Sequence, residues 1–477
     1  MESQSTGRRW WTLAAVVFAV FVTTLDNTVV NVALPSIQHD LHLGLSGLAW
    51  VVNAYILSFA VLLLTGGRLA DTFGRRRMFL FGLAGFTAAS LLAGLAPSPG
   101  LLIAARALQG VGAALMTPPT LAIISDVFPD PRERGTAVGI WAAVSAAAFS
   151  IGPVVGGLIT EKIDWTWIFF VNVPIGIVGL VMGWRLIPES RDPSAERRLD
   201  LPGLTVVSAS LFSLTYALLK ANDYGWGSPV ILSLLAVAAI GMVAFVGIER
   251  RVRAPMIDLS LFRNTTVTGA NVVMMVVNLA LFGVLLYTSL YLQEVIGYSP
   301  VRAGATLIPW VGVIVLVAPF TGLLANRFSV RWLVSTGVVL IAVALLLFSR
   351  LDEHATFVEM LPALLVGGLG GSLTAPLSSV VIGAVPTAKS GVASGVHNTF
   401  RETGGALGVA IMGAVFVSSQ AGALASGSTA AHAFVSGYSS ALQVGAVITF
   451  AAAALAAFAL GKVRSTAPAT DAVAEAA

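Results

Sequence analysis

The sequence predicts an all-α membrane protein with fourteen transmembrane helices, arranged as two six-helix bundles plus two inserted helices. Apolar residues make up 57% of the 477 residues and charged residues only 10%, whereas a soluble domain carries about 25% charged residues. The apolar residues also fall into blocks longer than about 18 residues, each long enough to cross a bilayer. Lipid offers the backbone no hydrogen-bond partner, and no alternating barrel pattern is present, so each block is expected to be helical.

The predicted spans are separated by charge clusters and by Gly or Pro turns. In chain order they cover residues 10–34, 48–69, 78–96, 100–125, 135–160, 165–187, 201–219, 228–248, 267–292, 303–325, 331–349, 358–382, 391–417 and 436–460. Because each block is one crossing of the membrane, the usual estimate of domain number from chain length does not apply.

Lys and Arg residues are distributed unequally between the two sides that alternate loops define. When both termini are placed on one side, that side holds 21 of the 27 basic residues and the other holds 4, while Arg106 and Arg401 fall inside spans. Cytoplasmic loops carry the excess of Lys and Arg in membrane proteins. The chain is therefore expected to be a multi-pass protein of the cell membrane with both termini in the cytoplasm.

The loop after the second span has a partial copy later in the chain. Residues 67–77 read GRLADTFGRRR, and residues 322–331 read GLLANRFSVR. Transporter folds are commonly built from duplicated bundles. The expected organisation is a first bundle with its connector in residues 1–200, an inserted helix pair in 201–250, a second bundle in 251–464 and a disordered Ala-rich tail in 465–477.

Ionisable residues inside a span are costly and are therefore candidate functional residues. The first span carries Asp26 beside Asn27, with Asn31 one turn further along, and the fourth span carries Arg106 and Gln109. At 1.5 Å per residue, Asp26 and Arg106 lie roughly 13 and 10 Å inside the same end of their helices, so they can pair. The pair would be either a structural ion pair that lowers the cost of insertion or a switchable proton site.

The thirteenth span holds a second polar cluster. Asn398 and Glu402 share one stripe of the helix, and Arg401 lies on the neighbouring stripe. A buried Glu402 could exchange protons or meet a cationic substrate, or Arg401 could simply neutralise it within the bundle. Gln293 and Glu294, near the end of the ninth span, are expected to be solvated at the interface.

The fifth span contains the sequence Gly152-Pro153-Val154-Val155-Gly156-Gly157. Pro153 lacks a backbone donor, and the glycines let another helix approach closely. A kink and a tight helix interface are expected here.

Composition disfavours other classes of function. The chain has no cysteine, which excludes disulfides, thiolate metal sites and cysteine nucleophiles, and its five histidines are scattered. An intramembrane enzyme would need a convergent nucleophile or metal cluster, so an enzyme or a passive channel is disfavoured. No phosphate-binding loop motif is present, and ATP hydrolysis is not expected. The net charge of +4 comes from topology signals in loops rather than from a nucleic-acid surface.

Together these segments resemble the major facilitator superfamily, specifically its fourteen-helix drug:proton antiporter branch, from about residue 12 to residue 460. The segments that carry the resemblance are 25–35 (LDNTVVNVALP, similar to the first-helix signature), 67–77 (the cytoplasmic loop motif), 106–110 (RALQG, the fourth-helix motif), 152–157 (the fifth-helix antiporter motif), 165–174 and 293–304. Within 165–174, Thr166 replaces the arginine that is usual in the family.

The resemblance implies two bundles that rock around a central cavity, with substrate moving outward as protons move inward. By position, it implies that Asp26 and Arg106 take part in proton coupling. It also implies a cytoplasmic gate in which Asp71 pairs with Arg75 and Arg76, in a charge network that differs between the inward-open and outward-open states. The residues of this gate motif are Gly67, Asp71, Gly74, Arg75 and Arg76, and those of the antiporter motif are Gly152, Pro153, Gly156 and Gly157. Glu402 departs from the family pattern, in which a neutral polar residue is common.

The leading hypothesis is therefore proton-coupled export of small hydrophobic or amphipathic drugs, including cationic ones, by a non-enzymatic protein that needs no cofactor. The expected partners are the lipid bilayer, a small-molecule substrate and protons, and the protein is expected to be a monomer. The alternative is a dedicated exporter of one endogenous metabolite, lipid or self-made antibiotic. The sequence leaves both open, because selectivity depends on which side chains face the cavity.

Overall fold

The computed structural model describes residues 6–191, 200–252, 255, 257, 259–317, 320, 321, 324, 328–385 and 390–460. The regular elements in these ranges are all helices, which confirms the predicted all-α class. Three predicted features lie wholly or largely outside the described residues. They are the tail at 465–477, the connector at 192–199, and Asn326 and Arg327 of the repeated loop.

The helices are long and follow one another through short turns. Up to the inserted pair they are α1 (Thr6–Leu41), α2 (Leu45–Phe73), α3 (Arg75–Gly94), α4 (Pro99–Val127), α5 (Pro131–Lys162), α6 (Trp167–Phe170) and α7 (Asn172–Leu186), followed by the pair itself, α8 (Leu201–Tyr224) and α9 (Pro229–Glu249). After a short 3-10 turn, η1 (Leu259–Arg263), come α10 (Thr265–Glu294), α11 (Pro300–Thr306), α12 (Ile308–Val317), α14 (Val330–Phe348), α15 (Phe357–Thr374), α16 (Leu377–Gly383), α17 (Ser390–Ala425) and α18 (Ala430–Ala459).

The predicted spans coincide with these helices. Thirteen stretches in the described part of the chain are helical, long and apolar enough to cross a membrane. The remaining predicted span, the fifth, lies within α5, which has 32 residues and is therefore about 48 Å long. The sixth, tenth and twelfth spans are each divided, between α6 and α7, α11 and α12, and α15 and α16. The structure thus agrees with fourteen crossings.

Several helices extend beyond the predicted spans. The first span was expected at 10–34, whereas α1 runs from Thr6 to Leu41. Apolar composition reports only the part of a helix in hydrocarbon, about 20 residues, and helical hydrogen bonding continues into the headgroup region. Some helices end at glycines with positive φ, such as Gly74 (119°) and Gly427 (87°), a conformation that only glycine adopts at low cost.

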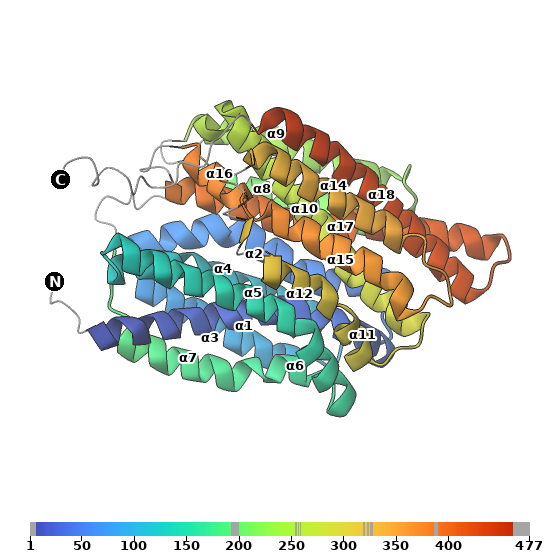
Figure 1. Cartoon of the computed structure of the whole chain (residues 1–477), viewed down its shortest axis with the longest axis horizontal. Helices are drawn as coiled ribbons and strands as arrows, with labels where there is room; N and C mark the ends of the chain where they lie inside the picture. Colours follow the sequence, from blue (N-terminus) through green and yellow to red (C-terminus); the bar gives the residue numbers. More distant parts are fainter. Residues whose placement is uncertain are drawn as a thin grey trace.

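The helices form two groups that occupy different halves of the molecule (Figure 1). In the first group, α4 packs against α2 and α3, and α1 packs against α5 and α7; in the second, α10 packs against α17 and α18, and α14 packs against α15 and α18. We call the first group, α1 to α7, the N-bundle and the second, α10 to α18, the C-bundle. The exact domain boundaries at residues 200 and 250 stay predictions.

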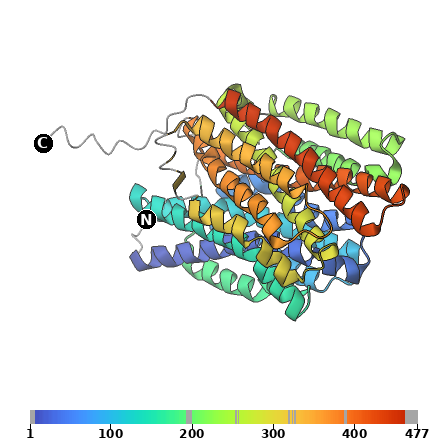
Figure 2. The same ribbon diagram turned by 45° about the vertical axis from the view of Figure 1, so that its right-hand side comes forward.

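The inserted pair lies at the periphery of the molecule (Figure 2). α8 packs against α2 of the N-bundle and α17 of the C-bundle, and α9 packs against α8. The Trp50 ring of α2 lies 5.6 Å from Phe212 and 6.0 Å from Tyr216 of α8. Much of α9 is exposed and apolar, as at Val243, so this helix presents its side chains to lipid.

The two ends of the molecule differ in how the bundles meet. α1 and α5 begin at the same end, where Arg9 lies 3.6 Å from Glu133. We call the opposite end, where α1 and α5 finish, the distal end. The C-terminal part of α5 meets α11 there, and α1 meets α10.

Candidate functional site

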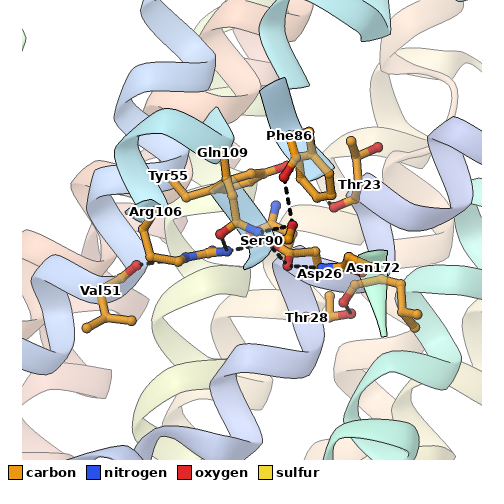
Figure 3. Close-up of polar contacts among 12 residues, drawn as sticks. Thr23, Asp26, Thr28, Val51, Tyr55, Phe86, Ser90, Arg106, Gln109 and Asn172 are labelled. Carbon is orange, nitrogen blue, oxygen red and sulfur yellow. Dashed lines mark hydrogen bonds and ion pairs between the residues drawn. The ribbon is translucent and has the colours of Figure 1, made fainter. Parts of the chain in front are cut away.

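Asp26 lies at the centre of a buried polar cluster in the N-bundle (Figure 3). Its Oδ2 accepts a hydrogen bond from Arg106 Nη1 of α4 at 2.5 Å. Its Oδ1 accepts from Asn172 Nδ2 of α7 at 2.7 Å and from Gln109 Nε2 of α4 at 3.2 Å. The Asp26 and Arg106 side chains are each 1% exposed, so the structure brings together the pair that the helix depths predict.

Arg106 has further partners besides Asp26. Its Nε donates to the Val51 carbonyl at 3.2 Å, and its Nη1 also donates to Gln109 Oε1 at 2.9 Å. Its guanidinium carbon lies 4.5 Å from the centre of the Tyr55 ring, a cation–π contact. A buried ion pair is tolerated only when its remaining donors and acceptors are satisfied, and these contacts satisfy the arginine from α2 as well as α4.

Three members of this cluster were missed by the sequence reasoning. Tyr55 stacks on Arg106, Ser90 of α3 accepts from Gln109 Nε2 at 2.7 Å, and Asn172 contacts Asp26 directly. Each is a single uncharged polar residue in an apolar helix. The available signal was Asn172, which lies in the segment 165–174 that resembles the family.

We define the Asp26 site as Asp26, Tyr55, Ser90, Arg106, Gln109 and Asn172. The two other predicted members from α1 lie beside it. Asn31 is 3% exposed and donates to the Asn27 carbonyl at 3.2 Å. Asn27 is partly buried, and its side-chain oxygen has no hydrogen-bond partner among the described residues.

The polar cluster of α17 lies in the C-bundle. Arg401 donates from Nε and Nη2 to Glu402 Oε1 at 3.0 and 2.8 Å. The Arg401 side chain is 40% exposed, whereas that of Glu402 is 6% exposed, and Asn398 is partly buried. Glu402 Oε2 has no partner within the described part of the chain. The two residues do pair, but half of the carboxylate stays available to another donor.

Glu402 lies on α17, which packs against α2 of the N-bundle. The two carboxylates predicted from separate spans, Asp26 and Glu402, therefore belong to elements on opposite sides of the boundary between the bundles.

The predicted gate loop forms a charge network at the end opposite the distal end. Arg75 bridges Asp71 and Asp126, with N–O distances of 2.9 and 2.5 Å. Arg76 differs from the expectation, because its guanidinium donates to the Trp184 carbonyl instead of pairing with Asp71. Sequence reasoning missed Asp126, which lies 51 positions from Arg75.

The two glycines of the gate motif differ in how strictly the structure requires them. Gly74 has a φ of 119°, and a Cβ there would lie 2.5 Å from Glu189 Oε1, which accepts from the Arg76 backbone N–H at 3.2 Å. A Cβ on Gly67 would lie 3.4 Å from Pro118, an ordinary contact. Gly74 is therefore required by both conformation and space, whereas Gly67 only permits close packing.

The predicted glycine motif of α5 packs against two other helices. A Cβ on Gly152 or Gly156 would lie 1.9 Å from Thr28 Oγ1 or 2.7 Å from the Val29 carbonyl oxygen, both of α1. A Cβ on Gly157 would lie 2.4 Å from the carbonyl oxygen of Pro300, the first residue of α11. The tight interface predicted from sequence is present, and it joins α5 to α1 within the N-bundle and to α11 across the bundle boundary.

The contact with α11 is reciprocal. A Cβ on Gly304 of α11 would lie 2.2 Å from the Pro153 carbonyl oxygen. Glu161, at the end of α5, accepts a hydrogen bond from the Val301 N–H at 3.3 Å. The backbones of α5 and α11 therefore meet directly at the distal end, and the Glu161 side chain adds a hydrogen bond between the two helices.

Comparison with protein families gives one match over most of the chain. The model described as Major Facilitator Superfamily matches residues 16–409.

Two curated relatives illustrate the similarity. A puromycin resistance protein of Streptomyces alboniger is 39% identical over 435 residues, which cover 90% of this chain and 86% of that protein. A tetracenomycin C resistance and export protein of Streptomyces glaucescens is 35% identical over 413 residues, which cover 86% of this chain and 77% of that protein.

Among solved structures, a bacterial homologue of the human lysosomal transporter Spinster, in an inward-facing and unoccupied conformation, superimposes with a TM-score of 0.66. The alignment covers 95% of this chain and 96% of that one at 17% identity. At this identity the likeness establishes the fold of two six-helix bundles and carries no information on cargo.

Proposed function

This chain belongs to the major facilitator superfamily, and we propose that it exports small hydrophobic or amphipathic molecules of the antibiotic class in exchange for protons. Its curated relatives are antibiotic resistance and export proteins, and they support the class of cargo. The Asp26 site carries the proton-coupling part of the proposal.

The observation that carries the proposal is a buried carboxylate whose partners can also satisfy its neutral form. If Asp26 takes up a proton, its ion pair with Arg106 is lost. Arg106 then retains the Val51 carbonyl, Gln109 Oε1 and the Tyr55 ring. Arg106 therefore keeps hydrogen-bond partners when Asp26 is neutral. A buried arginine without any partner would cost several kcal/mol.

Asn172 suits both protonation states of Asp26. Its amide nitrogen donates to Asp26 Oδ1, and its Oδ1 has no partner in the described structure. A protonated carboxyl has one O–H donor, which a rotated Asn172 amide can accept. Gln109 likewise keeps Ser90 as an alternative acceptor. A purely structural ion pair needs no such second set of partners.

The transport cycle follows from the arrangement of the bundles. The distal contacts between α5 and α11 and between α1 and α10 close that end. The excess of basic residues on the terminal side supports cytoplasmic termini, and in the proposed topology the distal end then faces the outside. In the proposed cycle, substrate enters the cavity from the cytoplasm. After the distal end opens, a proton from outside binds Asp26 and neutralises its carboxylate. We place the protein in the cell membrane as a monomer.

Substitution of Asp26 tests the proposal. Asp26→Asn has the same shape but cannot exchange a proton, so gradient-driven efflux of a substrate panel should fall to the level of cells without the protein, at unchanged protein abundance. Asp40→Asn is the matched control. Asp40 lies on the same helix, is exposed and accepts from Trp165 Nε1 at 3.0 Å, which an amide oxygen also does. Undiminished efflux by Asp26→Asn would remove Asp26 from the mechanism.

A dedicated exporter is the second candidate, because both relatives are described by a single antibiotic, puromycin in one case and tetracenomycin C in the other. The same efflux assay with a chemically diverse panel separates the two. A broad exporter lowers the accumulation of several unrelated compounds, whereas a dedicated exporter lowers that of one.

A further inference from the structure

Two side chains of α10 donate hydrogen bonds to backbone carbonyls of α1 across the bundle boundary at the distal end. Ser289 Oγ donates to the Asn31 carbonyl at 3.0 Å, and Gln293 Nε2 donates to the Val32 carbonyl at 3.0 Å. Gln293 Nε2 also lies 3.1 Å from Ser289 Oγ, which ties the two side chains together. The expectation that Gln293 is solvated at the interface is therefore wrong. It is partly buried and bonded to the opposite bundle.

A proline explains why the Asn31 carbonyl accepts this bond. In a regular helix, the N–H of residue 35 would donate to the carbonyl of residue 31. Residue 35 is Pro35, inside α1, which has no N–H and whose ring displaces the carbonyl four residues earlier. An unpaired carbonyl is costly inside a membrane protein, and neighbouring Ser or Thr side chains commonly satisfy it. Here the satisfying hydroxyl comes from the other bundle.

The two acceptor carbonyls of α1, those of Asn31 and Val32, lie close to Asp26 along the same helix. Asn31 and Val32 lie five and six residues beyond Asp26, about 8 to 9 Å along the helix. Between them, Gly152 and Gly156 of α5 bring the two helix backbones into contact at Thr28 and Val29. This stretch of α1, which joins Asp26 to the two carbonyls, is therefore packed closely against α5.

We propose that Ser289 and Gln293, gripping the carbonyls of Asn31 and Val32, form a distal latch that holds the bundles closed at the outer end. Pro35 supplies one of the two acceptors of the latch, the Asn31 carbonyl. When α1 shifts in the transport cycle, the acceptors move away from α10 and the latch opens, so the proton site and the outer gate share one helix. The proposal rests on the proposed function in taking the distal end as the outer gate.

A distance measurement tests the latch. The chain contains no cysteine, so the double variant His39→Cys/Glu294→Cys takes spin labels at two exposed positions near the distal ends of α1 and α10. Double electron–electron resonance in lipid nanodiscs, at a pH where this labelled parent shows both a short and a long distance, reports the closed and open populations. Ser289→Ala and Gln293→Leu should each raise the ratio of long to short distances roughly 2- to 10-fold, the size of one hydrogen bond.

Pro35→Ala tests the origin of the acceptor. Alanine restores an N–H that bonds the Asn31 carbonyl within α1, so Pro35→Ala should itself raise the ratio. Adding Ser289→Ala in that background should then change it less than twofold. A full Ser289→Ala effect in the Pro35→Ala background would overturn the role assigned to the proline.

Thr288→Val is the matched control. Thr288 is the neighbour of Ser289 and is also buried, but its hydroxyl lies 3.0 Å from Tyr438 of α18 in its own bundle. The ratio of long to short distances in Thr288→Val should match that of the labelled parent. An unchanged ratio in both Ser289→Ala and Gln293→Leu, or an equal rise in Thr288→Val, would overturn the latch. The measurement uses neither substrate nor a proton gradient, so its failure is distinguishable from failure of the Asp26 proposal.

Discussion

At the scale of single residues, two of the donors to Asp26 also have other partners. Arg106 has the Val51 carbonyl and the Tyr55 ring, and Gln109 has Ser90. The carboxylate receives three side-chain donors in a place from which water is excluded. Such a site has hydrogen-bond partners for both the charged and the neutral carboxyl, as proton coupling requires.

Arg106 can be tested through stability. Arg106→Leu leaves the Asp26 charge buried without its cation, which should lower the free energy of unfolding by about 3 to 5 kcal/mol. The double variant Asp26→Asn/Arg106→Leu buries no charge and should recover most of that loss, while remaining unable to transport. Thermal unfolding of the purified variants measures both effects. A double variant as unstable as Arg106→Leu would contradict the view that the unpaired charge is the cause.

Glu402 can be tested through substrate charge. Its Oε2 is buried and has no partner among the residues that the structure describes, so we predict that a cationic substrate pairs with this oxygen when the bundles part. Glu402→Gln should reduce efflux of cationic substrates about tenfold, the value of a charge-assisted hydrogen bond, and leave neutral substrates near wild type. Glu359→Gln, in the exposed capping box of α15, is the control. Wild-type efflux of both substrate classes would make the Arg401–Glu402 pair purely structural.

At the scale of elements, α1 connects the Asp26 site to the contacts that close the distal end. It carries Asp26 in its middle, packs against the glycines of α5 and offers two carbonyls to α10. Its length of 36 residues exceeds the roughly 20 needed to cross the bilayer. Two devices close the distal end, the latch between α1 and α10 and the backbone contact between α5 and α11.

The α5–α11 contact predicts the effect of a larger side chain at Gly157. A Cβ there already falls 2.4 Å from the Pro300 carbonyl oxygen, so Gly157→Leu should force the distal ends apart. Efflux should fall at least tenfold, while equilibrium binding of substrate to the purified protein changes little. Gly85→Leu on α3 is the control, because no atom lies within 4 Å of a Cβ at that exposed position. Normal efflux by Gly157→Leu would argue against a gate at this contact.

At the scale of the whole molecule, the features that one helix carries by itself could be predicted, and those that need two helices could be predicted only in part. Apolar blocks and basic loops predicted the fourteen crossings, because lipid acts on each helix separately. The Asp26–Arg106 pair could be predicted because both residues are charged inside spans, and depth along a helix follows from residue number.

The remaining members of the Asp26 site needed the tertiary structure. Tyr55, Ser90 and Asn172 are ordinary residues for a membrane helix. Only the packing of α2 and α3 against α4, and of α7 against α1, brings them together around Asp26, Arg106 and Gln109. Gln293 was misassigned for a similar reason. A polar residue at a helix end is normally solvated, and its partner here is the Val32 carbonyl of another helix, next to the Asn31 carbonyl that Pro35 frees.

Proton movement in liposomes tests the central claim most directly. Purified protein is reconstituted with a pH-sensitive dye inside, and substrates are added outside without an imposed gradient. If Asp26 couples export to proton entry, each transported substrate should drive protons in the opposite direction in the wild type, and Asp26→Asn should abolish this signal while Asp40→Asn retains it. Substrate uptake by the wild type without any change in internal pH, or an undiminished proton signal from Asp26→Asn, would contradict it.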